Sequence, residues 1–117
     1  LCGPVLCDRS KPELKQLSPK TAGILASAGV ATAIITDHPV IPAQYLPLCA
    51  ALCVRDGMDR ASALRAITLT PAQICGIDHR VGSIMPGKDA DFLLLRGDLF
   101  DMMNKPQMVF VNGRRIL

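Results

Sequence analysis

The 117-residue sequence predicts an α/β fold, and three observations support this prediction. Residues 30–36 (VATAIIT) are apolar and β-branched without alternation, which is typical of a strand covered by helices on both faces. Helix start and stop signals lie on both sides of this segment. After Ile77 the pattern changes to short apolar runs separated by Pro-Gly and Asn-Gly pairs, which indicates antiparallel strands. We therefore expect helices around a buried strand, followed by an antiparallel sheet.

Capping and stop residues predict the helices. Residues 10–13 (SKPE) have the pattern of a capping box with proline in the first turn. Ser18 followed by Pro19 indicates a second helix start, and Gly29 ends that helix because glycine accepts a left-handed conformation. Three further helices are expected: residues 44–55, which Gly57 ends, residues 60–67 with Asp59 as N-cap, and a short helix from Thr70-Pro71 to Gly76.

Four short strands are expected after Ile77, at residues 81–85, 90–96, 108–112 and 114–117. The pair Asn112-Gly113 is the strongest turn signal among them, because both residues accept the positive φ of a type I′ turn. We therefore expect a hairpin that joins the last two strands.

Composition excludes several classes of function. The net charge is only +3 with no basic stripe, and aromatic residues make up 3% of the chain, so a nucleic-acid-binding surface is not expected. No apolar run reaches the roughly 18–20 residues of a membrane span.

The five cysteines include no C-x-x-C pair, and Cys49 and Cys53 share one face of an apolar helix. We expect these thiols to fill the core in a reducing compartment, which predicts a cytoplasmic protein.

Asp37 is the residue most suited to chemistry. It follows the predicted buried strand at its carboxyl end, where α/β barrels and open α/β sheets bind their ligands. A carboxylate there can bind a metal ion or take a proton from bound water, and the neighbouring His38 can bind a substrate. The alternative interpretation is that Asp37 caps the following turn and that His38 is an ordinary surface histidine. The only other histidine is His79, so these residues do not assemble a complete active site.

Several motifs together resemble one family. They are residues 35–40 (ITDHPV), 63–68 (ALRAIT) with Thr70-Pro71-Ala72, 80–84 (RVGSI) with 86–92 (PGKDADF), and 109–113 (VFVNG). In this combination the chain resembles the C-terminal part of the metal-dependent amidohydrolase superfamily, in its imidazolonepropionase-like branch. The resemblance covers nearly the whole chain. Since the chain opens at Leu1 in what the pattern indicates is the middle of a strand, we expect a fragment of a longer protein.

The resemblance implies a (β/α)8 TIM-type barrel with a small β-sandwich. Residues 1–77 would form the last strands and helices of the barrel, and residues 78–117 the C-terminal strands of the sandwich. Asp37 matches the aspartate that binds the metal and acts as general base, and His38 matches a position on the substrate side. Asp89 and Asp91 are expected to be structural. The other metal ligands of the family lie upstream of this chain.

The function implied is hydrolysis of carbon–nitrogen bonds other than peptide bonds. The expected cofactor is a divalent metal ion, zinc by preference, which activates water for attack on a small amide or cyclic amide. The expected partner is the N-terminal part of the barrel, and the resemblance allows a homo-oligomer. The 117-residue chain alone is expected to be inactive. The alternative is a non-catalytic binding or assembly module, a reading that the absence of the other ligands favours.

Overall fold

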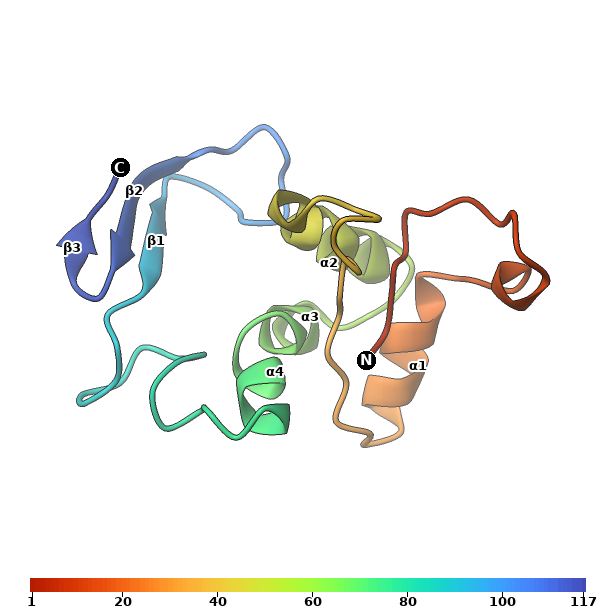
Figure 1. The fold of residues 1–117 in the computed structure, drawn as a ribbon, viewed down its shortest axis with the longest axis horizontal. Coiled ribbons are helices and arrows are strands. Elements are labelled where there is room, and N and C mark those ends of the chain that lie inside the picture. Colours follow the sequence, from red (N-terminus) through yellow and green to blue (C-terminus); the bar gives the residue numbers. More distant parts are fainter.

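A computed structural model describes all 117 residues, which form helices at one end and a three-stranded sheet at the other (Figure 1). The elements are, in chain order, η1 (Pro12–Leu14), α1 (Lys20–Ser27), η2 (Ala43–Tyr45), α2 (Leu46–Arg55), α3 (Arg60–Ala66), α4 (Leu69–Ile74), β1 (Phe92–Leu95), β2 (Pro106–Val111) and β3 (Arg114–Arg115), where η denotes a 3-10 helix. The α/β class expected from the sequence is therefore confirmed at this level.

The core lies among α1, α2, α3 and the extended segment of residues 30–36. Its members are mostly small, and the largest side chains that are fully buried are the thiols of Cys49 and Cys53 on α2. Burial raises the pKa of Cys53 to about 11, with smaller contributions from Cys49 and Cys2, so this thiol stays protonated. The prediction that these cysteines fill the core is confirmed.

Residues 30–36 do not form the full strand that their composition predicts. The segment is extended, but its only ladder contact is one parallel bridge between Ile34 and Cys2. On its other side the Ile34 amide donates to the Ala66 carbonyl at the end of α3, at 3.0 Å. A helix carbonyl therefore takes the place of a neighbouring strand. Burial is also uneven, because Val30 is 50% exposed whereas Ile34 is 3% exposed.

Of the two helix N-caps predicted at Asp59 and Ser10, one is present in the structure. Asp59 caps α3 as predicted, since its Oδ2 accepts a hydrogen bond from the Ser62 amide at 2.8 Å. The predicted capping box at residues 10–13 is wrong. The Ser10 hydroxyl donates instead to Asp8 Oδ1 at 2.7 Å, and only the short η1 follows, without a side-chain cap. The N-cap of η1 is Lys11, one residue later than the box requires, so Ser10 is not placed to accept from the amide at the third helical position.

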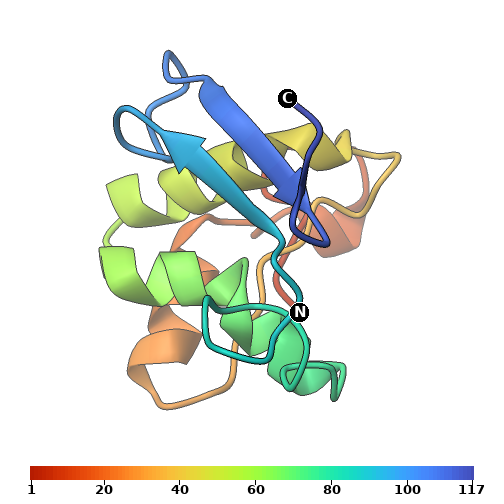
Figure 2. The same cartoon turned by 90° about the vertical axis from the view of Figure 1, so that its left-hand side faces the viewer.

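The C-terminal sheet has the order β1-β2-β3, and both pairs are antiparallel. Figure 2 shows the opposite directions of β1 and β2. Asn112 and Gly113 have φ values of 49° and 72°, so the predicted hairpin turn between β2 and β3 is confirmed. Phe92 and Phe110 face each other across β1 and β2, with ring centroids 4.5 Å apart. The sheet is thus held by pairing and aromatic stacking.

The strand predicted at residues 81–85 is not present. This segment consists of turns closed by Arg80 and Asp89, whose side chains lie 2.7 Å apart while the Asp89 amide donates to the Arg80 carbonyl at 2.8 Å. The hydrogen bonds of this loop are therefore made within the loop, and none of them pairs it with a neighbouring strand. Asp91 is also structural as expected, because its Oδ1 accepts from the Asn112 amide at 2.7 Å and ties the start of β1 to the hairpin.

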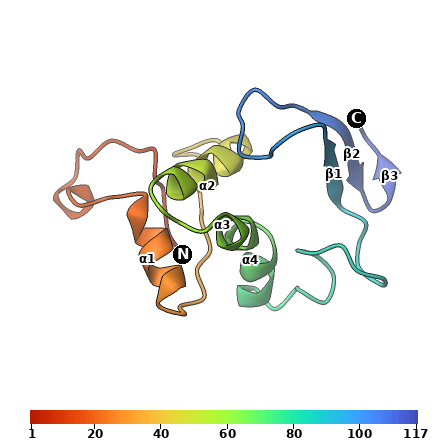
Figure 3. The same cartoon turned by 180° about the vertical axis from the view of Figure 1, so that it is seen from behind.

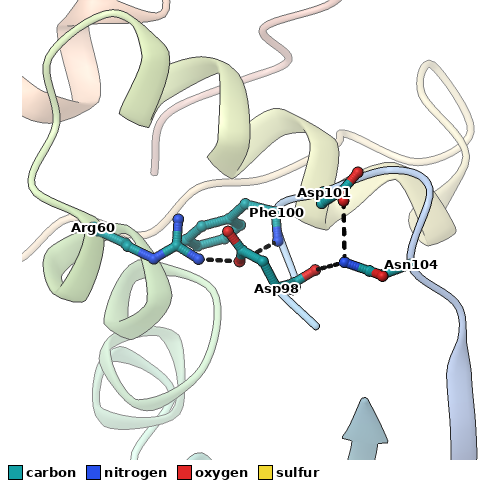
Figure 4. A network of polar contacts seen from close by, with 5 residues as sticks. All are labelled: Arg60, Asp98, Phe100, Asp101 and Asn104. Atoms are coloured by element: carbon teal, nitrogen blue, oxygen red, sulfur yellow. Dashed lines mark hydrogen bonds and ion pairs between the residues drawn. The ribbon is translucent and has the colours of Figure 1, made fainter. Parts of the chain in front are cut away.

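The loop between β1 and β2 extends from the sheet toward the helices (Figure 3), and its Asp98 contacts the start of α3. Arg60 at the start of α3 forms an ion pair with Asp98 and lies over the ring of Phe100, 4.9 Å from its centroid (Figure 4). Asn104 donates to the Asp98 carbonyl at 3.1 Å and to Asp101 at 3.2 Å, which fixes the loop internally. We call Arg60, Asp98 and Phe100 the clasp.

Candidate functional site

Asp37 begins a turn directly after the extended segment. Its φ of 55° is left-handed, a conformation that is uncommon for residues other than glycine and that aspartate and asparagine tolerate best. The Val40 amide donates to the Asp37 carbonyl at 2.8 Å and closes the turn. The side chain is exposed, so the carboxylate projects from the end of the segment toward solvent.

The Asp37 carboxylate has no hydrogen bond or ion pair within the chain. Most of the other carboxylates are engaged: Asp8, Asp56, Asp59, Asp89, Asp91, Asp98 and Asp101 each accept from a backbone amide or a side chain. The interpretation that Asp37 caps its own turn is wrong, because the turn is closed by its main-chain oxygen. The carboxylate is therefore available to water, to a substrate or to a metal ion.

The residues around Asp37 are fixed by their neighbours. Thr36 before it is buried at 7% exposure, and Ile41 after it belongs to the core with 5% exposure. Between these two anchors His38 is exposed and makes no side-chain hydrogen bond. The structure thus places Asp37 and His38 together on a short turn, with a buried residue on each side of it.

A second segment reaches the same edge of the structure. Because Cys2 and Ile34 pair in parallel, the carboxyl ends of both segments point the same way (Figure 1). The loop that leaves Gly3 and the turn that begins at Asp37 therefore start side by side. This is the arrangement that α/β proteins use for ligand sites.

The donor set within the chain does not make a complete metal site. Carboxylate and imidazole are ligand types that zinc accepts, but catalytic zinc needs three protein ligands, and no group of three or more His, Cys, Asp or Glu side chains comes together here. His79 lies in the turns after α4, outside the turn that carries Asp37. At this turn the structure therefore brings together one carboxylate, Asp37, and one imidazole, His38.

A large groove lies elsewhere in the molecule. A groove of about 1080 Å³ separates α3 from β1, and neither Asp37 nor His38 lines it. Its walls are mostly apolar, with Leu64, Phe92 and Leu95 among them, and the three residues of the clasp also line it. Sequence reasoning missed both the groove and the clasp, because Arg60 and Asp98 lie far apart in the chain and neither has a motif around it.

Known proteins match this chain along nearly all its length. A sequence profile of the amidohydrolase family matches residues 2–116. The chain is 38% identical over 92 residues to an imidazolonepropionase of Geobacillus kaustophilus, with 76% of this chain and 20% of that protein covered. It is 29% identical over 107 residues to an adenine deaminase of Clostridium botulinum, with 89% of this chain and 17% of that protein covered.

A solved structure agrees closely with the fold. The crystal structure of an amidohydrolase from Thermotoga maritima superimposes with a TM-score of 0.93 at 40% identity, and covers 98% of this chain and 30% of its own. The chain thus spans less than a third of each of these relatives. None of its helices has the length and apolar character needed to cross a bilayer.

Proposed function

The chain belongs to the amidohydrolase family, and from this premise we propose that it forms the end of the catalytic barrel of a hydrolase. The enzyme would act on carbon–nitrogen bonds other than peptide bonds, in a small amide or cyclic amide. The relatives named imidazolonepropionase and adenine deaminase support a small-molecule substrate. In this proposal residues 1–77 belong to the barrel and residues 78–117 to the associated β-sandwich.

Asp37 is the general base of the proposed reaction. Its carboxylate takes a proton from the attacking water and later gives it to the leaving nitrogen, a role that needs an accessible oxygen without a competing partner. The observation that carries this assignment is the unpartnered carboxylate at the carboxyl edge of a parallel pair. A bound divalent metal ion, with zinc expected, would lower the pKa of water to about 7 and polarise the carbonyl. Asp37 would be one of its ligands, and the others would come from outside these residues.

His38 is proposed to bind the substrate. It is exposed beside Asp37 and its ring nitrogens have no partner within the chain, so it can donate to or accept from a carbonyl or amide group. The anchored turn limits how far the imidazole can move from the reacting carboxylate. This placement favours an orienting role over a structural one.

The rest of the barrel is the proposed partner of this chain. Many large apolar side chains are exposed, including Leu64 on α3 and Leu93 and Leu94 on β1, each at 45%. The chain covers 30% of the similar Thermotoga maritima protein, so the remaining part of such a protein is long enough to cover these faces. The alternative of a non-catalytic module gains no support from the relatives, whose names are those of enzymes.

The test of the proposed function is Asp37→Asn in the protein expressed from its complete coding sequence. Asparagine keeps the shape and accepts the left-handed backbone, but it cannot hold the proton. We expect kcat to fall by about 10²–10⁴-fold on a panel of cyclic amides, N-acetyl amino acids, imidazolonepropionate and adenine.

The matched control is Asp78→Asn, which removes another carboxylate that has no hydrogen bond or ion pair in the chain but lies after α4. Its kcat should equal that of the wild type. Wild-type turnover in Asp37→Asn would remove Asp37 from the mechanism, and an equal loss in both variants would show that the effect is not specific to this site.

A further inference from the structure

Two backbone segments pair next to Asp37. The Cys2 amide donates to the Ala33 carbonyl at 2.7 Å, and the Ile35 amide donates to the Cys2 carbonyl at 2.9 Å. These two hydrogen bonds hold the first residues of the chain against the segment that ends at Asp37. The next residue, Gly3, then lies directly against Ile35.

Gly3 has no room for a side chain. A Cβ atom there would lie 2.1 Å from the Ile35 carbonyl oxygen and 2.9 Å from Ile35 Cγ1. Its φ of +150° is also a conformation that L-residues rarely adopt. By contrast, a Cβ at Gly29, where φ is +79°, would meet nothing within 4 Å. At Gly3 the obstacle is a neighbouring backbone, which cannot rotate away as a side chain can.

We propose that Gly3 is a positioning residue for Asp37, an inference that rests on the general-base role proposed for Asp37. Ile35, against which Gly3 lies, is two residues before Asp37. The Asp37 carboxylate makes no hydrogen bond of its own within the chain, so its place is determined by the backbone that carries it. Gly3 sets the distance between the two segments and thereby the place of the carboxylate.

The experiment compares Gly3→Ala with Gly29→Ala in the protein expressed from its complete coding sequence. Both substitutions put a Cβ on a residue with positive φ, but only the first pushes against the segment that carries Asp37. In Gly3→Ala we expect kcat to fall by about 10–100-fold with KM little changed, because a misplacement near 1 Å costs up to about 100-fold. In Gly29→Ala we expect lower thermal stability with kcat unchanged.

Amide hydrogen exchange gives a readout that does not depend on activity. The Ile35 amide should lose protection in Gly3→Ala and keep it in Gly29→Ala, because its acceptor is the Cys2 carbonyl. Unchanged kcat in folded Gly3→Ala, or unchanged protection of the Ile35 amide, would overturn the proposal. If Asp37→Asn retains activity while Gly3→Ala loses protection at Ile35, the proposed function fails and the effect of Gly3 on the backbone stands.

A second variant covers the case in which Gly3→Ala does not fold. Cys2→Pro removes the amide that donates to the Ala33 carbonyl and leaves the glycine at position 3 unchanged. It loosens the same pairing, so kcat should fall by about tenfold or more, and Ile35 protection should decrease. Wild-type kcat in folded Cys2→Pro would overturn the positioning role.

Discussion

The helical part of the molecule (residues 1–77) and its sheet part (residues 78–117) are stabilised in different ways. Every buried residue of the chain lies between Ala22 and Ala72, and the sheet part contains none. The helical part therefore has a core, whereas the sheet part relies on strand pairing, one aromatic stack and the clasp. Burial of apolar side chains thus stabilises the helical part, whereas hydrogen bonds between strands and a few side-chain contacts stabilise the sheet part.

The proposed site depends on contacts in the helical part. Asp37 is anchored by Thr36 and Ile41, both of them buried, so its backbone belongs to the region with the core. The sheet part contacts that region through the clasp and through Gly82, which lies against α4. Changes in the core should therefore affect the site, and changes in the sheet should leave it in place.

The largest effect on stability is expected from Ile34→Ala. Ile34 is 3% exposed and pairs with Cys2, so its truncation leaves a cavity and should lower the free energy of unfolding by about 2–5 kcal/mol. The matched control in the sheet is Leu94→Ala, at 45% exposure, for which we expect a loss of about 1 kcal/mol or less. Denaturant unfolding of the 117-residue chain, followed by circular dichroism, measures both. Equal losses would mean that the sheet part has a core of its own.

A smaller effect is expected from Gly113→Val in the hairpin. Gly113 has a φ of +72°, and a Cβ there would meet only Ala90 Cβ at 3.8 Å, an ordinary contact. The substitution should therefore lower the free energy of unfolding through backbone conformation alone, by about 1 kcal/mol or more for a β-branched residue. Gly113→Asn is the control, since asparagine tolerates this conformation and should lose less. A denaturation midpoint unchanged by valine would show that this turn does not limit the stability of the sheet part.

The same contrast explains what the sequence could predict. Signals that act within a few residues were reliable, such as the Asp59 cap and the Asn112-Gly113 turn. The capping box at residues 10–13 did not form, because the short η1 has Lys11 as its N-cap and the Ser10 hydroxyl donates to Asp8, which lies outside the pattern. The strand at residues 81–85 failed because Arg80 and Asp89 close that loop on itself.

The candidate site was predictable in part. The pattern of residues 30–36 placed Asp37 at the end of an extended segment, and the structure agrees on that position. Its left-handed φ and its unpartnered carboxylate, however, follow from the folded turn. The close approach of Gly3 to Ile35 joins residues 32 positions apart, and no local pattern encodes that contact.

The smallest predicted effect concerns the clasp and its dependence on pH. The Phe100 amide, and to a lesser extent Arg60, lower the pKa of Asp98 below its usual range. A carboxyl whose pKa is lowered by folding contributes stability above its unfolded pKa, and this contribution is lost as the pH falls through the folded pKa. We expect Asp98→Asn to flatten the decrease in thermal stability on the acid side, with little change in the helical part.

Asp59→Asn tests whether that effect belongs to the contact between the two parts. The pKa of Asp59 is lowered as well, mainly by the Ser62 amide, but this carboxylate caps α3 and has no partner in the sheet part. Both variants should reduce the acid dependence, whereas only Asp98→Asn should speed amide exchange at Phe100. High salt should weaken the ion-pair share of the Asp98 effect, because the Arg60 and Asp98 side chains are 55% and 37% exposed and their attraction is screened. Equal exchange at Phe100 in the two variants would mean that the clasp does not hold the sheet part to α3.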